Sequence, residues 1–64
     1  MQPGESQDER IRIAETVRFA CVHAAQQGYE RAAADGLCDE GAFEVALDAI
    51  RSLDIESLLC ELRP

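Results

Sequence analysis

The sequence predicts an all-α fold, a small helical hairpin or three-helix bundle. Apolar residues recur at intervals of three and four over most of the 64-residue chain, which is the spacing of one helix face. Ten of the thirty apolar residues are alanine, the strongest helix former. We expect helices over residues 8–34, 39–52 and 55–62, with residues 1–7 as a flexible polar arm and residues 8–64 as a single domain.

The first predicted helix begins at Asp8, because Asp8 and Glu9 favour the positive end of a helix dipole. Its apolar stripe consists of Ile13, Val17, Ala20 or Cys21, and Ala24. Further apolar residues widen this stripe, namely Ile11, Ala14, Val22, Ala25, Tyr29, and Ala32 or Ala33. Gly28 costs about 1 kcal/mol relative to alanine inside a helix. The alanines that follow favour continuation, so we expect one long helix with Gly28 as its point of bending.

The stretch "GLCDEGAFE", residues 36–44, predicts a tight turn between two helices. Gly36 can end the first helix, because glycine adopts the left-handed conformation at low cost, and Leu37 can then fold back onto the last turn. Asp39 is the expected N-cap of the second helix, with Cys38 and Phe43 as a hydrophobic staple.

The second and third helices show the clearest apolar patterns. The second has an apolar face made of Phe43, Ala46, Leu47, Ile50 and Leu53. Gly41 in its first turn suggests that another backbone segment passes close by. Asp54 is suited to cap the third helix. Short connections make consecutive helices antiparallel neighbours.

Size and charge limit the classes of function. A chain of 64 residues buries only about 60% of its unfolded surface, so a partner chain or a second copy of the chain is expected. The net charge is −7, with six arginines and no lysine, which argues against nucleic acid and anionic membranes as direct ligands. Residues 32–64 carry eight acids and two arginines, so this half is the candidate for meeting a basic surface.

No catalytic or metal motif is present in the sequence. His23 is the only histidine, and its neighbours one helical turn away, Phe19 and Gln27, are not nucleophiles. Cys21, Cys38 and Cys60 form no CxxC pair and are interpreted as small buried apolar residues. We therefore expect no enzyme, no cofactor and no metal. The N-terminus lacks the apolar segment of a secretory signal, which predicts a cytoplasmic location.

The predicted partner-binding surface has an acidic part and an apolar part. Glu40, Glu44 and Asp48 follow an i, i+4, i+8 spacing on one face of the second helix, with Arg51 at its end. The apolar part lies in and before the third helix and consists of Leu53, Ile55, Leu58, Leu59 and Leu62. Each part has a structural alternative, namely a solvated face for the acids and an intramolecular core for the apolar residues.

The arginines of the first helix also allow two interpretations. Arg10, Arg12 and Arg18 alternate with acids, and Glu15 with Arg18 is one possible intrahelical pair. We favour such pairing within the helix. The alternative is pairing with the acidic second helix of another copy in an antiparallel dimer.

Residues 28–59, "GYERAAADGLCDEGAFEVALDAIRSLDIESLL", resemble a family of small acidic antiactivators carried by mobile integrative elements, the QseM-like proteins. The residues that carry the resemblance are Gly36, Leu37, Cys38, Glu40, Gly41, Phe43, Glu44, Ala46, Ala49, Arg51, Leu53 and Asp54. It covers about half of the chain and includes no catalytic signature.

The resemblance implies a protein that binds and blocks a transcriptional activator, either a LuxR-type quorum-sensing regulator or an activator of element excision. The residues themselves are compatible with this function, because a small acidic helical protein can bind a basic DNA-binding protein without binding DNA. The alternative function is a structural module for dimerisation or assembly with no regulatory ligand.

Overall fold

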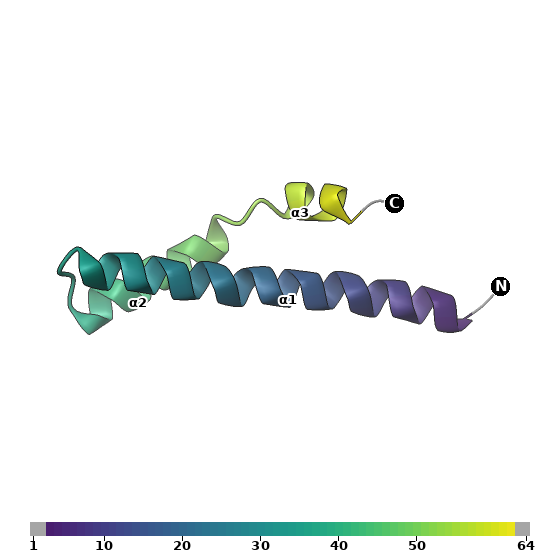
Figure 1. The fold of residues 1–64 in the computed structure, drawn as a ribbon, viewed down its shortest axis with the longest axis horizontal. Coiled ribbons are helices and arrows are strands. Elements are labelled where there is room, and N and C mark those ends of the chain that lie inside the picture. The colour runs from purple at the N-terminus through teal and green to yellow at the C-terminus, as the bar shows by residue number, and fades with distance from the viewer. Residues whose placement is uncertain (1–2, 63–64) are drawn as a thin grey trace.

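The chain folds into three helices joined by short connections. The computed structural model describes residues 3–62, with side chains from residue 8 onward, and contains no strand within that range. The helices are α1 (Pro3–Ala34), α2 (Asp39–Arg51) and α3 (Ile55–Glu61). In Figure 1, α2 folds back along α1, and α3 lies beside α1 nearer its N-terminal half. The predicted all-α fold is confirmed.

The N-terminal boundary of α1 differs from the prediction. The helix begins at Pro3 and not at residue 8, so residues 3–7 of the expected arm are helical. Proline is well tolerated as the first helical residue, because its missing N–H would have no partner there. Residues 1 and 2 of the expected arm lie outside the described range.

The turn after α1 has the predicted glycine stop. Gly36 has a φ of +95°, which favours glycine over any residue with a side chain. The N–H of Gly36 donates to the carbonyl of Ala33, and the N–H of Leu37 donates to that of Ala32, both at 3.0 Å. These two bonds form a Schellman motif, which satisfies the last carbonyl groups of α1.

The start of α2 differs from the prediction in two respects. Cys38 is the N-cap and makes no side-chain cap hydrogen bond, whereas Asp39 is the first helical residue. With Cys38 as the N-cap, a hydrophobic staple would pair Leu37 with Ala42. The predicted staple between Cys38 and Phe43 is therefore wrong by one position. Phe43 is instead 58% exposed.

The neighbour of Gly41 is a side chain and not the backbone segment that we expected. A Cβ at Gly41 would lie 3.4 Å from Cδ2 of Leu37, the residue just before the N-cap. Leu37 therefore folds over the first turn of α2, at a distance that leaves room for a Cβ at position 41.

α3 begins as predicted. Asp54 is its N-cap and accepts hydrogen bonds from the backbone N–H of Ser57 at 3.1 Å and from the Ser57 hydroxyl at 2.7 Å. These bonds favour the charged carboxylate and lower the pKa of Asp54 below its ordinary value.

The contact between α1 and α2 depends on small residues. Gly28 is buried in the middle of α1, and a Cβ there would lie 3.2 Å from Cβ of Ala49 and 3.4 Å from Cα of Ala46. A Cβ at this position would force Ala49 to shift slightly, so the close approach of the two helices favours a residue without a side chain. Gly28 thus marks the closest approach of two helices, a role that we did not predict.

The core is small for a chain of this length. The buried apolar residues are Ala32, Ala42 and Ala46, and no large side chain among the described residues is fully buried. The Cα trace measures 54 × 17 × 14 Å with a radius of gyration of 15.4 Å. A compact domain of this length would have a radius of gyration of about 11 Å. The fold is therefore an open hairpin of α1 and α2 with α3 added beside it.

Within residues 3–62, no helix is long and apolar enough to cross a membrane.

Candidate protein-interaction surface

The acidic row predicted on α2 is present and faces solvent. Glu40, Glu44 and Asp48 are all exposed, as is Arg51 in the last turn. The opposite side of α2, with Ala42 and Ala46, packs against α1. The acids therefore occupy the face of α2 that the chain leaves free.

An open apolar groove lies between α1 and α2. Its volume is about 420 Å³, and it is lined by Ala25, Gln26, Tyr29 and Glu30 of α1 and by Phe43, Ala46, Leu47 and Ile50 of α2. The floor includes the buried Ala46, and Phe43 and Tyr29 are 58% and 37% exposed. Two large aromatic side chains that line the groove thus remain partly exposed.

A second, more polar hollow of about 690 Å³ continues from the groove toward the start of α2. It shares Tyr29 and Phe43 with the groove, and Asp39, Glu40, Gly41 and Glu44 complete its lining. Two members of the acidic row therefore border the same depression as the exposed aromatic residues.

Tyr29 connects the two helices at this hollow. Its hydroxyl donates to Oδ1 of Asp39 at 3.1 Å. The hydrogen bond to the carboxylate and its negative charge both stabilise the protonated phenol, so the pKa of Tyr29 is raised above its ordinary value. Asp39, expected to cap α2 with its side chain, is instead the partner of a residue on α1.

The apolar residues of α3 and of the segment before it are only partly covered. Leu53, Leu58 and Leu62 are half-buried, whereas Ile55 and Leu59 are 42% and 41% exposed. No residue of α3 is buried. The interpretation of this set as a completed core is therefore wrong, and part of it remains open to solvent.

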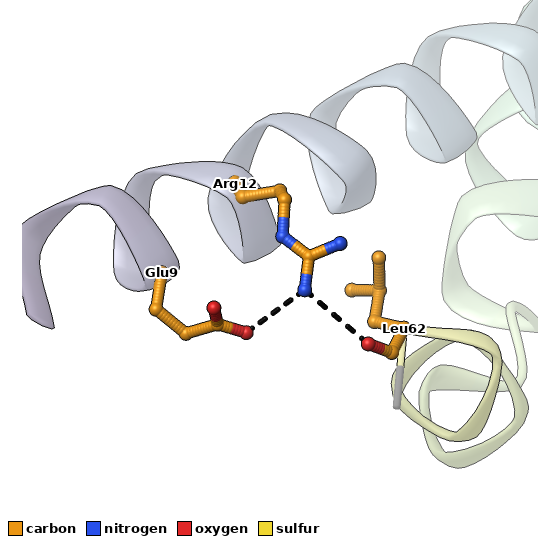
Figure 2. Close-up of polar contacts among 3 residues, drawn as sticks. All are labelled: Glu9, Arg12 and Leu62. Carbon is orange, nitrogen blue, oxygen red and sulfur yellow. Dashed lines mark hydrogen bonds and ion pairs between the residues drawn. The ribbon is translucent and has the colours of Figure 1, made fainter. Parts of the chain in front are cut away.

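The polar contact that attaches α3 to α1 is made by Arg12, as Figure 2 shows. Nη2 of Arg12 lies 2.9 Å from Oε2 of Glu9 and donates to the carbonyl oxygen of Leu62 at 3.3 Å. The predicted intrahelical pair is also present, because Nη1 of Arg18 lies 3.5 Å from Oε1 of Glu15. Pairing within α1 is thus confirmed for these two arginines.

The cysteines and the histidine line neither hollow. Cys38 and Cys60 are exposed and Cys21 is half-buried, so the prediction of buried cysteines is wrong. His23 is exposed and stacks on Phe19, with ring centroids 6.1 Å apart. Within residues 3–62, no cluster of three or more His, Cys, Asp or Glu residues is placed to hold a metal ion.

The fold and the surface together define an open helical hairpin with an acidic face and an apolar groove. No protein-family model, curated protein or solved structure matches the chain. The function is therefore inferred from the surface itself.

The predicted site and the observed surface overlap only in part. The structure brings Glu40 and Glu44 to the border of the hollows but places the apolar set of α3 elsewhere, beside α1. Sequence reasoning missed Tyr29, Phe43 and Leu47 as surface residues, because it assigned them to apolar stripes facing the core. The signal that could have indicated the groove was the high content of alanine and glycine. Such small side chains provide too little volume to cover Tyr29, Phe43 and Leu47.

Proposed function

We propose that this protein is a helical interaction module that binds a transcriptional activator and inhibits it, as an antiactivator does. The observation that carries the proposal is the placement of exposed apolar side chains beside a row of acids on α2. A DNA-binding activator has a basic DNA-reading face and, in many cases, an apolar dimerisation surface. The net charge of −7 on this chain complements the basic DNA-reading face of the activator. The uncovered apolar residues of the chain complement the apolar dimerisation surface.

The activator belongs to one of the two classes implied by the resemblance, a LuxR-type quorum-sensing regulator or an activator of the excision of an integrative element. Inhibition would follow from covering either surface of the activator. Both act on DNA in the cytoplasm, where this module would meet them.

A charge-reversal experiment tests the proposal. Glu44→Arg combined with Asp48→Arg places two positive charges in the acidic row, which should weaken binding of a basic partner at least tenfold. The readouts are copurification of the activator from the native host and transcription from an activator-dependent reporter. The helical circular dichroism should not change, because both residues are exposed.

The matched control is Asp35→Arg combined with Glu61→Arg. Both residues are exposed, and both lie at helix C-termini, where arginine is favourable. The control has the same net charge as the test variant, so inhibition should be retained. Failure of the native protein to copurify any transcription factor, with no effect on the reporter, would refute the proposal.

A second candidate function is a dimerisation or assembly module with no regulatory ligand. The observation that favours it is the core of three alanines, which leaves large apolar side chains for another copy to cover. Light scattering after size exclusion tests it, since a tight dimer that covers Phe43 and Leu59 would have no free apolar surface for an activator.

A further inference from the structure

We propose that the groove between α1 and α2 binds a basic amphipathic helix of the partner. This inference deepens the proposed function, because it names the element of the activator that docks and the place where it docks. It differs from the surface predicted from the sequence, since α3 takes no part in it.

The groove has the shape of a helix-binding site. Two antiparallel helices leave a long depression along each side of their contact, which a third helix fills in bundles. The small residues Gly28 and Ala46 keep α1 and α2 close together, while Phe43 and Tyr29 form walls. A partner helix with apolar residues at i, i+3, i+4 and i+7 fits such a groove.

No helix of the described chain fills this position. α3 contacts α1 near Arg12, which donates to the carbonyl oxygen of Leu62. Tyr29 lies 17 residues further along α1, which corresponds to about 25 Å along the axis and about 100° around it. The groove and α3 therefore lie on different sides and at different levels of α1. In Figure 1, α3 lies nearer the N-terminal end of α1 than α2 does.

The charge around the groove selects the occupant. The residues that line the groove and the adjoining hollow include Glu30, Asp39, Glu40 and Glu44, and no arginine. Arginine or lysine on the two edges of an amphipathic helix would lie against these acids while its apolar face covers Phe43. A second copy of the chain is a poorer occupant, because each copy carries a net charge of −7.

Binding of a defined peptide tests the inference. The probe is a fluorescent helical peptide with leucine at i, i+3, i+4 and i+7 and arginine on both flanks. The control peptide has glutamate in place of every arginine. The native protein should bind the arginine peptide, with an affinity that falls as salt is added, and should not bind the control peptide.

Two phenylalanine variants locate the binding site. Phe43→Ala should weaken binding about thirtyfold, as expected for an aromatic anchor at the centre of an interface. Phe19→Ala removes an equally large side chain that is 73% exposed on α1 and lines neither hollow, so its affinity should stay within about twofold of the native value. Circular dichroism checks that both variants remain helical.

Other results would overturn the inference. Unchanged affinity in both phenylalanine variants would show that the peptide binds by charge alone, and equal losses in both would show that it does not bind at the groove. A dimer that Phe43→Ala dissociates, in a protein that binds no peptide, would show that a second copy occupies the groove.

The activator assay separates this inference from the proposed function. Suppose that the Ile55→Ala and Leu59→Ala variants no longer copurify the activator, whereas Phe43→Ala still does. The groove is then the wrong site, although the antiactivator function stands. If the peptide responds as expected while no activator is captured, the groove is supported and the antiactivator function fails.

Discussion

Gly28 determines how closely the two long helices approach. Most glycines inside a helix lower stability because they increase the freedom of the unfolded chain. At this position the missing side chain allows the Cα of Ala46 and the Cβ of Ala49 to lie within contact distance of the backbone of α1. Glycine at this position therefore lowers the helix propensity of α1 but allows α1 and α2 to pack closely.

Replacement of Gly28 by leucine should destabilise the protein by about 1–3 kcal/mol, because the added side chain forces α1 and α2 apart. Denaturant unfolding monitored by circular dichroism measures the change. The control is Gly41→Ala, where the neighbour is the movable end of the Leu37 side chain. This control should gain up to about 1 kcal/mol from helix propensity. A leucine at position 28 that leaves stability unchanged would contradict the assigned role.

The contact between Tyr29 and Asp39 can be tested through the pKa of Tyr29. It is the only tyrosine, and the chain has no tryptophan, so the ultraviolet absorbance of its phenolate reports on this site alone. Asp39→Asn removes the carboxylate that raises the pKa of Tyr29, so the pKa should fall toward its ordinary value. Because the folded-state pKa is raised, the stabilisation from this contact is present at neutral pH and is lost as the pH rises through the folded-state pKa.

The control for this titration is Asp35→Asn. Asp35 is an exposed acid just after the end of α1, and it is not the hydrogen-bond partner of Tyr29. Its tyrosine titration should match that of the native protein. An unchanged titration in Asp39→Asn would show that the contact between Tyr29 and Asp39 does not persist in solution.

The three helices differ in how they are held. α2 contacts α1 along much of its length, whereas α3 has seven residues, none of them buried, and approaches only α1. A helix of this length is unstable in isolation, so its capping by Asp54 and its contacts with α1 must maintain it. α3 should accordingly be the first helix to open.

Hydrogen exchange can measure this difference. Amides of α3 should exchange faster than those around Gly28 and Ala46, and Arg12→Ala should increase exchange in α3 further by removing the hydrogen bond to Leu62. Arg18→Ala is the control, since Arg18 makes an equivalent i, i+3 ion pair with Glu15 but no hydrogen bond to α3. Identical exchange in the two variants would mean that Arg12 does not help to hold α3.

The whole molecule is elongated and has little interior. Its buried apolar side chains are alanines, each of which contributes little buried area. We expect a free energy of unfolding below about 5 kcal/mol for the monomer, at the lower limit of ordinary domains. Urea unfolding at several protein concentrations measures it, and a midpoint that rises with concentration would show that a second copy contributes to stability.

The sequence predicts the helices well but the surface only in part. The left-handed Gly36, the capping Asp54 and the apolar periodicity are local signals, and they place the ends of α2 and α3 within one residue of those observed. The start of α1 was missed, because polar residues 3–7 have no apolar pattern to extend. The N-cap of α2 was missed because the Asp39 side chain bonds instead to Tyr29, ten residues earlier on α1.

The groove could not be predicted in this way, because it is a property of two helices together. Phe43 and Leu47 have the spacing of core residues, but Phe43 is exposed and Leu47 is only half-buried. Helical spacing identifies the apolar face of α2 but does not say how much of that face α1 covers.

The exposed thiols have a consequence for the state of the protein under oxidation. Cys38 lies at the turn that joins α1 to α2, and Cys60 lies in α3, close to the residue that contacts Arg12. These regions are separated by about 23 residues of α1, or about 35 Å. A disulfide requires Cα atoms within about 7 Å, so these two cysteines cannot cross-link within one folded chain. A disulfide between Cys38 and Cys60 would therefore join separate molecules covalently.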